Sequence, residues 1–127
     1  MPDAPAQQAL FAAVDAYFET MFDADLDRFD RLFAATATLH GLRDGGLRVL
    51  TAADYRNLLA SSPSPKAKHA PRQQEILLVD FAAADQALVK VRVRIDGLFY
   101  LDYLCFHRVG GAWRLTAKSF HIERRFA

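Results

Sequence analysis

Asp102 is the residue whose type and setting point most directly to chemistry. It is the one charged residue in residues 98–106, Leu-Phe-Tyr-Leu-Asp-Tyr-Leu-Cys-Phe, which are otherwise apolar or aromatic. A carboxyl group in such a strand either faces water or is buried, and burial raises a carboxyl pKa because it penalises the charged form. Two interpretations stay open. Asp102 is either a neutral acid that donates a hydrogen bond to a ligand oxygen, or a structural partner of a neighbouring polar group.

A first turn sequence assigns Asp102 to a face of the predicted sheet. Asp96-Gly97 separates two strand-like runs, and a two-residue loop of this type predicts a hairpin in which Val91 pairs with Asp102. Directly paired residues lie on the same face. The face that carries Asp102 is the aliphatic one, so the carboxyl group is predicted to point into the core.

A second turn, Gly110-Gly111, adds polar neighbours to Asp102. If the two strands pair regularly on either side of this loop, Asp102 lies opposite Ser119 and Tyr100 lies opposite His121. The predicted cluster on the core face is therefore Tyr100, Asp102, Ser119 and His121. A shift of one residue would move the side chains of the last strand to the other face.

Two histidines are candidate general bases. His121 belongs to the predicted cluster, and imidazole titrates near neutral pH. His40 is adjacent in sequence to Gly41, but strand alternation turns it away from the face that Leu39 and Gly41 share. Only a bulge would bring His40 inward. On these grounds the candidate catalytic residues are His40, Asp102 and His121.

The elements that position these residues begin with helices. Apolar residues at spacings of three and four predict a first helix capped by Asp3, and Asp25 opens a shorter second helix. Short strands at residues 37–40 and 47–50 follow. Thr51 and Asp54 resemble a capping box that starts a third helix. The proline-rich residues 61–72 are interpreted as a solvated connection, with a lid over a pocket as the alternative.

Four strands joined by tight turns complete the chain, which predicts a single α+β domain over residues 1–127. In this arrangement helices pack on one face of a curved, mostly antiparallel sheet. A net charge of +1 gives no reason to expect nucleic acid or an anionic membrane as a partner. The single cysteine and the absence of a His/Cys cluster predict no disulfide, metal or cofactor. No apolar run approaches membrane length, and a cytoplasmic location is expected.

Three motifs resemble the nuclear-transport-factor-2-like superfamily. They are residues 17–27 (Tyr-Phe-Glu-Thr-Met-Phe-Asp-Ala-Asp-Leu-Asp), residues 32–39, and Asp-Tyr-Leu at 102–104 followed by Gly-Ala-Trp-Arg-Leu-Thr-Ala-Lys-Ser-Phe at 111–120. Within that superfamily the chain looks most like the bacterial proteins called "putative lumazine-binding" and their SnoaL-like relatives. The resemblance implies a cone-shaped fold whose curved sheet wraps around the N-terminal helices.

A more distant similarity to ketosteroid isomerases can be followed residue by residue. The oxyanion hole of those enzymes combines a helix tyrosine with a protonated aspartic acid. The resemblance places Tyr17 on the tyrosine and Asp102 on the aspartic acid. It places the general base on Gly41, so the donor half of the site is present and the base is absent.

The resulting prediction is a small-molecule-binding protein with an apolar cavity and a Tyr/Asp donor pair, and its ligand is a small apolar or aromatic molecule. The first alternative is an isomerase, dehydratase or cyclase that transfers protons on a carbonyl compound. The second is a dimerisation module without a ligand. The predicted ligand contacts are Tyr17, Phe18, Met21, Tyr55, Val91, Tyr100, Asp102, Leu104, Trp113 and Ser119.

The face of the sheet opposite Asp102 is predicted to form a homodimer. Aromatic and arginine side chains are typical of protein interfaces, and related proteins commonly dimerise through this face. The alternative is that another segment of the same chain covers it. The residues assigned to this face are Lys90, Arg92, Arg94, Phe99, Leu101, Tyr103, Arg114, Lys118, Phe120 and Ile122.

Overall fold

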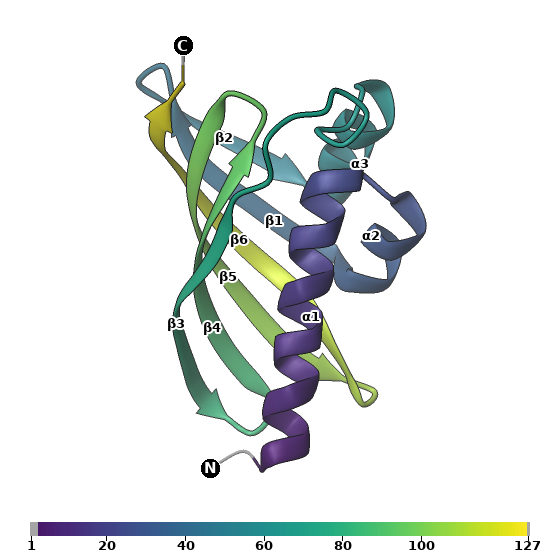
Figure 1. The fold of residues 1–127 in the computed structure, drawn as a ribbon. Coiled ribbons are helices and arrows are strands. Elements are labelled where there is room, and N and C mark those ends of the chain that lie inside the picture. Colours follow the sequence, from purple (N-terminus) through teal and green to yellow (C-terminus); the bar gives the residue numbers. More distant parts are fainter. Residues whose placement is uncertain (1–2, 127) are drawn as a thin grey trace.

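The protein, described by a computed structural model over residues 3–126, combines three helices with one six-stranded sheet (Figure 1). The predicted α+β class is confirmed. The elements are, in chain order, α1 (Ala4–Asp23), α2 (Leu26–Leu32), β1 (Phe33–Arg43), β2 (Gly46–Thr51), α3 (Ala52–Ser61), β3 (Gln74–Ala83), β4 (Gln86–Ile95), β5 (Leu98–Val109) and β6 (Ala112–Arg125).

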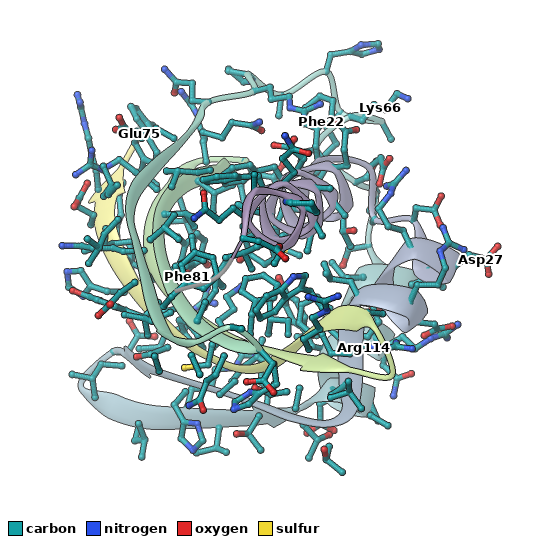
Figure 2. All side chains as sticks on the ribbon, turned by 90° about the horizontal axis from the view of Figure 1, so that it is seen from below. Phe22, Asp27, Lys66, Glu75, Phe81 and Arg114 are labelled. Atoms are coloured by element: carbon teal, nitrogen blue, oxygen red, sulfur yellow. The ribbon has the colours of Figure 1, made fainter. Side chains whose placement is uncertain are left out.

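The sheet is a curved, open structure with the strand order β2-β1-β6-β5-β4-β3. Only the β1–β6 pair is parallel, and the other neighbouring pairs are antiparallel. Seen along the axis of α1, the strands curve around that helix (Figure 2). The core therefore lies between α1 and the inner, concave face of the sheet.

Local sequence signals explain where the helices begin. The Asp3 side chain accepts a hydrogen bond from the Ala6 amide, and Asp25 caps α2 in the same way. Thr51 and Asp54 form the predicted capping box of α3. Helix α1 ends at Asp23, and the next residue, Ala24, caps it in the left-handed conformation while its amide donates to the Thr20 carbonyl.

The hairpin between β4 and β5 has the register predicted from its turn. Ile95 pairs with Leu98, and Val91 pairs with Asp102. Asp96 has a φ of 54°, the left-handed conformation that such a two-residue loop needs. The inward position of Asp102 is therefore confirmed, and its side chain is fully buried.

The hairpin between β5 and β6 departs from the predicted register after Leu115. Phe106 pairs with Leu115 as predicted, but Cys105 pairs with Ala117, so Thr116 has no partner on β5. This extra residue is a β-bulge, and it exchanges the two faces of β6 for the residues that follow. Asp102 is paired with Phe120 rather than with Ser119.

The inward positions predicted for Ser119 and His121 are therefore wrong. Both side chains are exposed on the outer face, whereas Lys118 is buried on the inner face. The assignments of Lys118, Phe120 and Ile122 to the outer face are wrong for the same reason.

The proline-rich connection follows the end of α1 before it enters β3. Lys66 donates its backbone amide to the Phe22 carbonyl at 3.0 Å, and Pro65 is buried. Most of the other residues in this segment are exposed. Within residues 3–126, no helix combines the length and the hydropathy that a membrane span requires.

Candidate functional site

Three buried polar side chains meet between α1 and the sheet. The Tyr17 hydroxyl donates a hydrogen bond to Asp102 Oδ2, and Lys118 Nζ lies 3.6 Å from the same oxygen. Tyr17 and Asp102 are completely inaccessible to solvent, and Lys118 is 5% exposed. A charged group at this depth is costly unless it is paired, so the three side chains form one electrostatic unit.

Each member of this unit comes from a different element. Tyr17 lies on the buried stripe of α1, and Asp102 lies on β5 in the register that the Asp-Gly turn sets. Lys118 reaches the unit only because the bulge at Thr116 turns it inward. Its ammonium nitrogen also lies 5.2 Å from the ring centroid of Tyr17 and 4.9 Å from that of Tyr55, within the range of cation–π attraction.

The electrostatics of the unit favour a neutral phenol beside a charged lysine. Burial, and then the adjacent carboxylate of Asp102, raise the pKa of Tyr17 well above its usual value. Burial alone would lower the pKa of Lys118. Attraction by Asp102, with contributions from Tyr55 and Tyr100, outweighs that effect, and the pKa of Lys118 is raised. Lys118 is therefore an ammonium group at neutral pH.

The hydrogen bond from Tyr17 directs its proton away from any ligand. Because the hydroxyl donates to Asp102, the carboxyl group acts as an acceptor in this structure rather than as a second donor. Neither residue lines either of the two adjoining cavities beside α3. Of the three, Lys118 is the member that reaches a cavity wall.

That cavity lies on the concave side of the sheet, beside α3, and has a volume of about 180 Å³. Its polar lining consists of Arg43, Arg48, Tyr55, Tyr100 and Lys118. Its apolar lining consists of Leu39, Leu50, Leu58, Leu59, Ile95 and Phe120. A smaller cavity of about 100 Å³ adjoins it and shares Tyr55 and Ile95, and it extends to the proline-rich segment at residues 62–65.

Gly41 stands where the resemblance to ketosteroid isomerases places a general base. A Cβ atom built on Gly41 would lie 2.2 Å from Cε2 of Phe120, which is far inside van der Waals contact. The ring of Phe120 therefore takes up the space that any side chain at position 41 would need. The bulge is again the cause, because it turns Phe120 inward.

The predicted site residues separate into three groups in the structure. Tyr55 and Tyr100 line the larger cavity, and Met21 lines the smaller one. Six predicted contacts are part of the packed interior instead: Tyr17, Phe18, Val91, Asp102, Leu104 and Trp113. Ser119, His40 and His121 are exposed on the outer face, on the opposite side of the sheet from Asp102.

The predicted set lacked Lys118, Arg43 and Arg48, the three cations of the cavity. A signal for Lys118 exists in the chain. In β6 the large apolar residues occupy odd positions at Trp113 and Leu115 but even positions at Phe120 and Ile122. Such a change of parity within one strand indicates an extra residue between the two halves.

Comparisons with known proteins give the same fold. An NTF2-like protein of unknown function from Silicibacter pomeroyi superposes with a TM-score of 0.86 at 22% identity, covering 97% of this chain and 100% of that one. An NTF2-like protein of unknown function from Shewanella baltica gives a TM-score of 0.81 at 20% identity, covering 98% of each chain. A ketosteroid isomerase-like protein from Erwinia carotovora atroseptica gives 0.63 at 14% identity, covering 93% of each chain.

Among curated proteins, none matches this sequence. The family model described as "Putative lumazine-binding" matches residues 5–121. Because that match spans nearly the whole chain, the protein belongs to this family.

Proposed function

We propose that the protein binds a small, mostly apolar ligand in the 180 Å³ cavity and that the Lys118 ammonium donates a hydrogen bond to a ligand oxygen. The observation that carries this proposal is the position of Lys118. It is a charged side chain, 5% exposed, in the wall of a cavity whose other lining is largely aliphatic and aromatic. Such a mixture of apolar walls and a few polar groups is typical of small-molecule sites.

The buried Tyr17–Asp102 pair supports Lys118 in this role. The carboxylate balances the charge of the ammonium group, and the Tyr17 hydroxyl satisfies one carboxylate oxygen. In this arrangement the pair holds the donor in place rather than contacting the ligand. In this proposal Lys118 is the donor to the ligand, in place of the Tyr17/Asp102 donor pair expected from the sequence.

Binding is favoured over proton-transfer catalysis by the composition of the cavity wall. Among the described residues that line it, none is an aspartate, a glutamate or a histidine. Lys118 has a raised pKa and is a poor base at neutral pH. An isomerase, dehydratase or cyclase needs a group that accepts the substrate proton.

The test compares two ligands that differ only in an oxygen. Acetophenone and ethylbenzene are titrated into the protein and followed by amide chemical shifts of cavity residues such as Tyr100 and Phe120. We expect acetophenone to bind about tenfold more tightly, because a hydrogen bond from a charged donor contributes about 1.5–3 kcal/mol. Lumazine, named in the family description, is included as a third probe.

Matched variants distinguish the contribution of the Lys118 hydrogen bond from the general effect of removing a lysine from the protein. Lys118→Met alone would leave the Asp102 carboxylate buried without its counter-ion, at a cost of about 3–5 kcal/mol. The double variant Asp102→Asn/Lys118→Met removes both charges and is expected to lose the preference for acetophenone. The control is Lys90→Met on the outer face, where Lys90 lies over the Tyr103 ring. An unchanged preference in the double variant would contradict the role of Lys118.

A further inference from the structure

The charges around the cavity are unbalanced. Its lining contains Arg43, Arg48 and Lys118, and no carboxylate among the described residues that form it. The charge of Lys118 is matched by Asp102 at 3.6 Å. Two positive charges therefore remain at the cavity without a protein counter-ion.

The β1–β2 hairpin places both arginines over the cavity. Arg48 pairs with Gly41 and Arg43 pairs with Gly46, and paired residues share a face. Gly41 is buried on the inner face beside Leu39, so both arginine side chains leave the hairpin on the concave side. Figure 1 shows this hairpin at the end of the sheet where the C-terminus also lies.

Arg43 and Arg48 also lack partners within the protein. Neither guanidinium forms a hydrogen bond or an ion pair with another residue in the described range 3–126. Other arginines of the chain are paired, for example Arg56 with Asp30 at 2.8 Å and Arg92 with Glu123 at 2.6 Å. Two guanidinium groups without a partner in the described part of the protein thus lie in the wall of the cavity.

We propose that the ligand of this cavity is a small carboxylic acid, with an apolar body about the size of one ring and a carboxylate that pairs with Arg43 and Arg48. This proposal rests on the proposed function, because it specifies the ligand of the same cavity. The size follows from the volume. An apolar cavity of about 150 Å³ accommodates a benzene ring, and this one measures about 180 Å³.

The chemistry of the walls agrees with this ligand class. Leu39, Leu58 and Phe120 offer apolar contact to the ring, while the arginines lie on the hairpin side. Guanidinium groups suit carboxylates because their N–H donors match two carboxylate oxygens in a planar, bidentate arrangement. A ring whose carboxylate points toward the hairpin would satisfy the apolar walls and the two charges together.

The test uses phenylacetate with its neutral isostere phenylacetamide and the cation phenethylamine. Binding is measured by calorimetry and located by amide shifts of Leu39, Tyr100 and Phe120. We expect the order carboxylate, amide, amine, with at least a tenfold advantage for phenylacetate over phenylacetamide at low salt. The advantage should shrink as salt is added, because the arginines are partly exposed.

The variant Arg43→Gln/Arg48→Gln is expected to remove the advantage of phenylacetate, so that the acid and the amide bind with similar affinity. The control, Arg31→Gln/Arg108→Gln, removes two charges from exposed positions outside the cavity and should keep the advantage. Equal binding of acid and amide at the cavity would overturn the carboxylate proposal and leave the proposed binding function standing. No shift at the cavity with any of the three probes would overturn both.

Discussion

At the scale of single residues, the site depends on which of three buried groups carries a charge. Tyr17 keeps its proton, Asp102 accepts it in a hydrogen bond, and Lys118 remains an ammonium group. The position and burial of Asp102 could be predicted because they follow from one local turn. Its cationic partner, Lys118, was not predicted, because Lys118 lies on another strand, β6, beyond a bulge.

Tyr17 provides a prediction for alkaline pH. Because its pKa is raised in the folded state, the native protein holds a proton that the unfolded chain loses above pH ~10. The stabilising effect of this shift is complete below pH ~10 and is lost as the pH rises through the native pKa. The free energy of unfolding should therefore fall as the pH rises above ~10 toward the native pKa of Tyr17.

Phenolate absorbance measures the same proton directly. The chain has four tyrosines, and Tyr17 should not contribute to the native titration near pH 11, about one unit above the usual tyrosine pKa. The native wild type and the native Tyr17→Phe variant should therefore show the same increase in phenolate absorbance up to this pH. In denaturant the wild type should gain one more phenolate than the variant. If the Tyr17→Phe substitution lowered the phenolate absorbance of the native protein near pH 11, Tyr17 would titrate there and its pKa would not be raised as stated.

At the scale of elements, the sequence predicts hairpins better than it predicts bulges. The β4–β5 register follows from Asp96-Gly97, a turn whose backbone geometry permits essentially one pairing. The bulge at Thr116 requires no glycine and leaves no local signature. The bulge shows in the sequence only as a shift of the large apolar residues of β6, from odd positions up to Leu115 to even positions from Phe120. This shift is visible only when both halves of the strand are compared.

Packing between β1 and β6 gives a prediction at this scale. Gly41→Ala places a methyl group against the ring of Phe120 and should lower the free energy of unfolding by about 1–3 kcal/mol. Phe120→Ala removes the obstructing ring. The double variant Gly41→Ala/Phe120→Ala should therefore lose less stability than the sum of the two single changes. Urea denaturation measures all four proteins, and additive losses would show that the two positions do not conflict.

At the scale of the whole molecule, the fold accounts for a cavity but does not specify its occupant. Structures with 14% to 22% identity share this cone, and folds of this kind host different chemistries. The helix stripes, caps and hairpins that define the cone could be predicted from the sequence. The side chains that give this cavity its charge, Arg43, Arg48 and Lys118, depend on strand register and were not predicted.

The outer face remains a proposed homodimer surface, with a changed composition. Phe120 turns inward, and β6 presents Ser119 and His121 outside instead. Exposed apolar side chains of this face are Leu42 at 65%, Leu47 at 66% and Val49 at 51% on β1 and β2, and Val109 at 62% on β5. A second copy of the chain would cover these residues and remove them from water.

Sedimentation equilibrium tests the homodimer. We expect the wild type to have twice the mass of one chain at micromolar concentration, and Val49→Lys to shift the equilibrium toward the monomer. Phe11→Lys serves as the control, because Phe11 is 42% exposed on α1 rather than on the sheet. A wild type that stays monomeric at high concentration would contradict the proposal.

The bulge at Thr116 has a consequence for how this family can change over generations. The same strand without the bulge, with Thr116 paired in a regular ladder, would exchange Lys118 and Phe120 for Ser119 and His121 in the interior, without replacing a single amino acid. An ammonium donor and a blocking ring would give way to a hydroxyl and an imidazole opposite Asp102. Relatives with similar sequences in this strand can therefore differ in chemistry through the presence or absence of the bulge alone, and alignments of the strand should be anchored on Trp113 and Asp102 rather than on matching letters.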